Sequence, residues 1–166
     1  MAKHQIIIHV AMEPLLKKLN FKGNTHIVVL NAPVSLQAMV KSWEQFAPVH
    51  SSISNQPVAF ALAFCRTQQQ VNSAAELLSS LAEGDAILWF CYPKASSKNY
   101  SCEFNRDTGW ALLGKLGWEP VRQVAIDEDW SALRFRNPAF IKTMTRSFAI
   151  TQAGQQKVAK NKKNIS

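Results

Sequence analysis

The hydrophobic pattern of this chain divides it into strand-like runs and helix-like segments that alternate. Residues 26–31, 58–65 and 86–92 are apolar on both faces, which is typical of strands in the middle of a covered, mostly parallel sheet. Residues 35–46 and 67–81 instead carry apolar side chains spaced three and four apart, as one face of a helix does. The alternation predicts right-handed strand–helix–strand units.

Local signals predict where the helices begin and end. Thr67 and Gln70 have the spacing of a capping box, and Gly84 is expected to end that helix in a left-handed conformation. A short helix is expected from Pro14 to Leu19, because proline suits the first helical position.

The part of the chain after the third strand contains a further helix and a hairpin. The helix is expected to begin at the cap Asn105, with Asp107 in its first turn, and to end at Gly117. Residues 121–126 and 131–135 are two short strands joined by so few residues that they must form an antiparallel hairpin. On the second of these strands, Arg134 and Arg136 are expected to share a side and to pair with acidic residues of the body.

The predicted units follow one another without an internal repeat. They are an N-terminal extension at residues 1–25, with a short strand at 6–10, an α/β core at 26–137 with a weak strand at 50–54, a helix within 138–153 and a disordered basic tail at 154–166. The core is expected to be a three-layer, Rossmann-like α/β domain with a mostly parallel sheet and a C-terminal antiparallel hairpin.

Four runs carry a family resemblance: VVLNAP at residues 28–33, WFCYPKASSK at 89–98, NRDTGW at 105–110 and IDEDWSALRFR at 126–136. They resemble a bacterial family of small proteins of unknown function, and the order of elements is similar to the fold of S-adenosylmethionine-dependent methyltransferases. The resemblance implies a methyltransferase-like topology, with no established activity to transfer.

The composition argues against a membrane-spanning or metal-binding protein, but it does not indicate an activity. The chain has 166 residues, of which 47% are hydrophobic, and no apolar run approaches the roughly 20 residues that span a bilayer. With no signal-peptide pattern, a cytoplasmic protein without membrane contact is expected. Three cysteines without a CxxC pair and four scattered histidines predict no metal site. Four lysines of the last ten residues account for half of the net charge of +8.

The residues after the first strand are unsuited to the usual cofactors of this fold. Nucleotide-binding turns use glycine because only glycine lets the backbone approach the ligand closely, and Asn31, Ala32 and Pro33 stand there instead. Residues 50–56, around the second strand, contain no acid that could accept ribose hydroxyls. No cofactor is therefore predicted: S-adenosylmethionine is not expected to bind, and the same argument disfavours NAD and FAD.

Polar side chains follow the three strong strands, and loops at the carboxyl ends of parallel strands converge at one edge of the sheet. The candidate ligand-binding residues are Asn31, Arg66, Thr67, Lys94, Ser96, Ser97 and Lys98. Together with the free amides of the helix at Thr67 they predict an anion site. The alternative is a solvated cluster of loops. Cys65 could be a thiolate at the same helix terminus, but a buried, inert thiol is favoured.

The function that fits these features best is a non-catalytic module that binds a small anionic ligand, a protein partner or a second copy of itself. The first alternative is an S-adenosylmethionine-dependent methyltransferase with a divergent cofactor site. The weaker alternative is a nucleic-acid-associated protein whose lysine-rich tail makes non-specific phosphate contacts.

Overall fold

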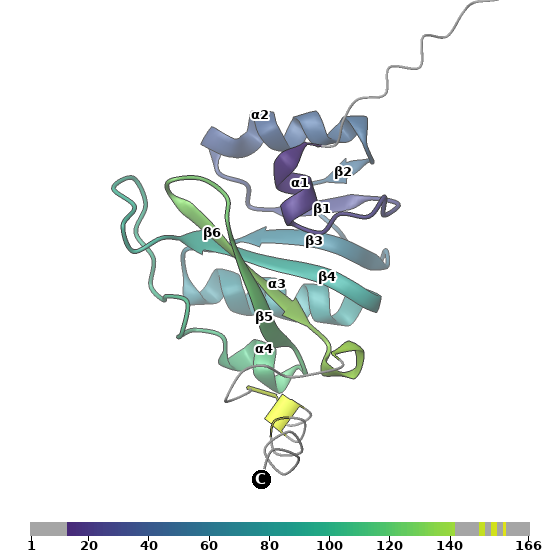
Figure 1. Ribbon diagram of the computed structural model, residues 1–166, viewed down its shortest axis with the longest axis vertical. Helices are drawn as coiled ribbons and strands as arrows, with labels where there is room; N and C mark the ends of the chain where they lie inside the picture. The colour runs from purple at the N-terminus through teal and green to yellow at the C-terminus, as the bar shows by residue number, and fades with distance from the viewer. Residues whose placement is uncertain (1–12, 142–149, 152–153, 156–157, 159–166) are drawn as a thin grey trace, which may run out of the picture.

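The computed structural model describes residues 13–141, 150–151, 154–155 and 158. Its centre is a six-stranded sheet with the strand order β2-β1-β3-β4-β6-β5 (Figure 1). Strands β1 to β4 are parallel to one another, whereas β6 runs antiparallel to β4 and to β5. The strands are β1 (Ile27–Leu30), β2 (Val49–His50), β3 (Val58–Phe64), β4 (Ala82–Pro93), β5 (Glu119–Ala125) and β6 (Trp130–Arg136).

Helices cover both faces of the sheet, so the predicted three-layer, Rossmann-like α/β fold with its closing hairpin is confirmed. One core lies between the sheet and α1 and α2, and the other lies between the sheet and α3 and α4. The helices are α1 (Pro14–Lys18), α2 (Val34–Ser42), α3 (Gln68–Leu81) and α4 (Ala111–Lys115), with 3-10 turns η1 (Trp43–Gln45) and η2 (Pro138–Phe140).

Strand β4 is buried on both faces because its side chains alternate between the two cores. Leu88 and Phe90 pack on the α3 side, and Ile87 and Trp89 pack on the α1 side. The indole N–H of Trp89 donates to the backbone carbonyl of Leu19 at 2.8 Å. The chain from α1 to Leu19, which the sequence predicts as part of an extension, is thereby attached to the middle of the sheet.

The strand order reverses between β1 and β3. From β1 the chain passes through α2 to β2 on one side, and residues 51–57 then return it to β3 on the other side. In open parallel sheets, ligands bind outside the carboxyl ends of the strands at such a reversal. This rule directs attention to the ends of β1 and β3.

The helix termini expected at Asn105 and Gly84 differ from those in the structure. Asn105 does not cap a helix: its side-chain oxygen accepts the amide of Asp107 at 2.8 Å, a local turn that competes with helix formation, and α4 begins only at Ala111. Gly84 does not end α3, because that helix ends at Leu81 and the following residues join β4, where Ala82 pairs with Val58 of β3.

The C-terminal predictions are tested in part. A helix was expected over residues 139–150, but Ile141 is extended, and residues 142–149 lie outside the described part of the chain, as does the strand expected at 6–10. Disorder was expected from Gly154 onward. The described residues Gly154, Gln155 and Val158 are helical, and Val158 is buried against Ile141. The rest of the tail lies outside the described residues, and its disorder stays a prediction. Within the described ranges no helix has the length and apolarity to cross a membrane.

Candidate functional site

The first predicted site residue, Asn31, lies between two open grooves at the end of β1. It adopts a left-handed backbone with φ 58°, a conformation that glycine adopts most readily. One groove, of about 370 Å³, runs along α3 past Gln70 and Ser73. The other, of about 420 Å³, lies against α2 and the end of β2, where Lys41 and Glu44 line it. Glu44 supplies an acid near β2 that the sequence analysis did not identify, because it precedes the strand instead of following it.

A carboxylate of the protein itself, that of Glu103, lies at the first turn of α3. Thr67 caps the helix by accepting the amide of Gln70 at 3.1 Å, and Gln70 completes the predicted capping box. The amide of Gln68, the first residue of the helix, donates to the carboxylate of Glu103 at 2.8 Å. Two of the amides that were expected to bind a ligand, those of Gln68 and Gln70, are therefore used by side chains of this protein.

The segment that carries Glu103 also crosses the end of β3. Arg66 donates to the carbonyl of Ser101 at 3.2 Å and to its hydroxyl at 3.3 Å, and the guanidinium lies 5.4 Å from the ring centre of Tyr100. The hydroxyl of Tyr100 is in turn 3.3 Å from that of Ser35, in the first turn of α2. These contacts bridge the strand reversal from the β4 side to α2.

Of the serines and lysines predicted after β4, some line a cleft and others point to solvent. Ser97 donates its hydroxyl to Asp129 at 2.8 Å, which attaches the loop to the turn of the β5–β6 hairpin. Lys94 and Ser97 line a cleft at the end of β4, whereas Ser96 and Lys98 are exposed and do not line it. The predicted residues therefore meet at one edge of the sheet without forming a single pocket.

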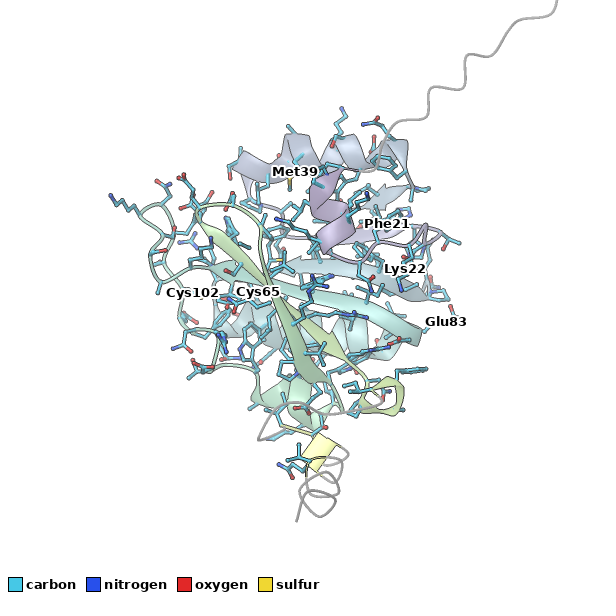
Figure 2. The ribbon with its side chains drawn as sticks, in the orientation of Figure 1. Phe21, Lys22, Met39, Cys65, Glu83 and Cys102 are labelled. Atoms are coloured by element: carbon cyan, nitrogen blue, oxygen red, sulfur yellow. The ribbon has the colours of Figure 1, made fainter. Side chains whose placement is uncertain are left out.

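The cleft at the end of β4, called the β4 cleft below, is the largest of the three hollows described here, with a volume of about 710 Å³. Figure 2 shows Cys102, on the loop after β4, close to Cys65. Both lie at the opposite end of the sheet from Glu83. The lining includes Tyr92, Lys94, Cys102, Phe104, Arg106 and Gln123. Aromatic rings thus lie beside two cationic side chains.

Burial controls the titration of the groups in and below this cleft. It raises the pKa of Tyr92, whose hydroxyl accepts a hydrogen bond from Gln123 at 2.9 Å, while the nearby positive charge of Arg106 opposes the shift. Burial also raises the pKa of the Cys102 thiol, and it raises that of Cys65 to about 12. Cys65 is therefore a protonated thiol at neutral pH, as the sequence analysis favoured.

Most of the cleft residues were missed by sequence reasoning. Residues 94–110 connect β4 to α4 without regular secondary structure, and such long loops inside compact domains are usually functional. That length was the available signal, and the incorrect helix at Asn105 concealed it. Gln123 comes from the hairpin and reaches the cleft only through strand pairing.

Comparisons with known proteins identify the fold. No protein-family model matches the sequence, and no curated protein matches it. Among solved structures, the pyocyanin biosynthetic protein PhzM superposes with a TM-score of 0.52 at 10% identity, covering 74% of this chain and 53% of that one. A SAM-dependent methyltransferase from Aquifex aeolicus superposes with a TM-score of 0.51 at 13% identity, covering 74% of this chain and 87% of that one.

These likenesses define a class. The domain has a methyltransferase-like, Rossmann-like α/β fold. The chain spans about half the length of PhzM. At such identities the similarity extends to the fold alone, and function has to be argued from the site.

Proposed function

We propose that this methyltransferase-like domain is a non-catalytic module that binds a small anionic ligand in the β4 cleft. The observation that carries the proposal is the bridge over the strand reversal. Side chains of the loop after β4 cross the strand reversal from the end of β3 to the first turn of α2, where open α/β sheets bind their ligands, and the open cleft lies next to that bridge.

The lining of the cleft defines the class of ligand. Tyr92 and Phe104 have ring centres 6.1 Å apart and provide an apolar wall. Lys94 and Arg106 provide positive charge beside it, and the one carboxylate in the lining, Glu103, already accepts the amide of Gln68. A flat, apolar body with a carboxylate or phosphate group complements such a site.

The state of the reactive groups supports binding over catalysis. A cysteine nucleophile needs a lowered pKa, and burial raises the pKa of Cys102. The hydroxyl of Ser97 donates to Asp129 and accepts the amides of Asn99 and Tyr100, so its role is to hold the loop.

Cys102 provides an internal reporter of occupancy. The rate of its alkylation by iodoacetamide is to be followed by mass spectrometry while benzoate or phenyl phosphate is titrated. We expect both anions to slow the reaction saturably, and Arg106→Gln to weaken this protection about tenfold, as expected for the loss of one charge-assisted contact of about 1.4 kcal/mol. Lys41→Gln, in the groove beside α2, is the matched control and should leave protection unchanged. Protection that survives Arg106→Gln unchanged would contradict the proposal.

The alternative, S-adenosylmethionine binding in a divergent mode, is favoured by one observation. Glu44 lines the groove at the ends of β1 and β2 and could accept ribose hydroxyls in place of the missing acid. Melting curves with S-adenosylmethionine and S-adenosylhomocysteine separate the two functions. We expect no saturable rise in melting temperature. A rise that Glu44→Gln abolishes would establish the alternative and overturn our assignment.

Association with nucleic acid through the tail stays a prediction, because the tail lysines lie outside the described residues. Replacing Lys160, Lys162 and Lys163 by alanine should abolish any salt-sensitive oligonucleotide binding. Binding that persists unchanged would exclude the tail as its origin.

A further inference from the structure

The face of the β5–β6 hairpin on the α1 side carries more positive charge than its acidic residues can neutralise. The predicted ion pair forms at Arg136, whose guanidinium donates to Asp85 at 2.9 Å. The neighbouring Lys22 and Arg134 both act electrostatically on the same carboxylate. Asp85 thus interacts electrostatically with three cationic side chains, but it accepts hydrogen bonds from Arg136 alone among the described residues.

Arg134 was also expected to pair with an acid, and within the described part of the chain it forms no such ion pair. It is only 9% exposed, and its Nε is buried without a hydrogen-bond partner. Among the described residues no carboxylate lies within ion-pair distance of its guanidinium. Burial lowers the pKa of Arg134, and repulsion from Arg136 and Arg122 adds to this effect, while the charge of Asp85 opposes it. A buried guanidinium whose nearest carboxylate is hydrogen-bonded to another arginine is unfavourable.

The strand register makes the shortage of negative charge more severe. Arg122 of β5 stands directly opposite Arg134, and like charges in that position repel each other. The nearest acid along the strand pair is Glu119, opposite Arg136. Its two carboxylate oxygens accept the amides of Ile150 at 2.8 Å and Thr151 at 2.9 Å.

We propose that Arg134 and Arg122 form a binding site for a phosphate group. Two guanidinium groups supply the forked N–H donors that match a tetrahedral dianion. Such an ion would give Arg134 a counter-charge that it does not share with Arg136. Arg122 and Arg134, which repel each other across the strands, would both be attracted to the same ligand. The ligand is a free phosphate or the terminal phosphate of a small ester. A nucleic-acid backbone fits less well, because Arg134 is recessed and a duplex needs exposed cations in a row.

This phosphate site is separate from the β4 cleft. Arg134 pairs with Trp89, whose side chain belongs to the core on the α1 side. The cleft is lined by Tyr92, which packs in the core on the α3 side. Because β6 is antiparallel to β4, its late residues also lie toward the amino ends of the parallel strands (Figure 1). The two sites are on opposite faces of the sheet.

The test is a titration of the full chain with sodium phosphate, followed by calorimetry and by thermal melting, against sodium chloride at equal ionic strength. We expect a saturable rise in melting temperature with phosphate alone. Arg122→Gln, at an exposed position, should weaken binding at least tenfold, and Arg134→Gln should abolish it. Lys115→Gln, an exposed lysine of α4 on the other face, is the matched control and should bind as the native chain does.

Further arms identify the source of the phosphate. Glycerol 1-phosphate that binds at least as well as inorganic phosphate indicates an ester ligand, and weaker binding indicates the free ion. An equal effect of chloride, unchanged affinity in Arg122→Gln, or an oligonucleotide that binds through Arg122 when phosphate does not, would each overturn the proposal. Alkylation of Cys102 should not respond to inorganic phosphate at Arg134, so this result and that for the β4 cleft can fail independently.

Discussion

Gly109 holds the loop that builds the β4 cleft, and replacing it by alanine tests that architecture. Its φ is 90°, in the region where a side chain is strained. A Cβ atom there would lie 2.7 Å from the Cβ of Phe104, far inside van der Waals contact. Phe104 cannot easily move away, since its ring packs 5.0 Å from that of Trp110.

The magnitude follows from two contributions. The left-handed backbone costs a non-glycine residue about 1–2 kcal/mol. Overpacking against Phe104 adds about 1–3 kcal/mol. Gly117 isolates the first contribution, because its φ is 91° and a Cβ atom there would meet nothing within 4 Å. We therefore expect Gly109→Ala to lower the free energy of unfolding by about 1–3 kcal/mol more than Gly117→Ala.

The assay is urea denaturation of both variants and the native chain, with melting curves as a second measure. For a chain of this size the extra loss corresponds to a melting temperature lower by roughly 2–4 °C for each kcal/mol. Cys102 should also be alkylated faster in Gly109→Ala, because the loop loses its packing. Equal destabilisation by the two substitutions would refute the close contact between Gly109 and Phe104.

Three further predictions concern the termini of the elements and the buried groups. Thr67→Ala removes the hydroxyl that caps α3 and should cost about 1 kcal/mol in urea denaturation, and Thr67→Ser should restore most of it. The hydrogen bond from Arg136 lowers the pKa of Asp85 from 3.8, so its stabilisation is present above that pH and is lost as the pH falls through the lower folded value. Asp85→Asn should therefore destabilise the protein at pH 7 and have little effect at the acid end of a pH series; an effect independent of pH would exclude this linkage. Iodoacetamide should modify Cys102 slowly and native Cys65 hardly at all, and equal rates by peptide mass spectrometry would contradict the burial of Cys65.

The hairpin was predictable from the sequence, but its pairing with β4 was not, and the partners of its arginines were predictable only in part. Arg134 and Arg136 lie on one face of β6, as strand alternation requires, and Arg136 forms an ion pair with Asp85. Whether an acid stands within reach of Arg134 depends on the register of three strands. The sequence contains no sign that Arg122 would stand opposite it.

The individual strands, the start of α3 and the hairpin were determined by residues that are close together in the sequence. The run from Val58 to Phe64 is apolar at every position and forms a buried strand wherever a covered sheet exists. The capping box of Thr67 and Gln70 closes within one turn, so its prediction needed no tertiary information. The hairpin was equally local, because a short connection allows only antiparallel pairing.

Tertiary structure alone decided which groups meet at the candidate site. Glu103 reaches the amide of Gln68, and Tyr100 reaches Ser35, across separations of 35 and 65 residues. These contacts cover the strand reversal, and they exist because the loop after β4 is long enough to cross two neighbouring strands. Hydrophobic periodicity reports which face of an element is buried. It carries no information on the path of a polar loop, and in this protein that path determines where a ligand can bind.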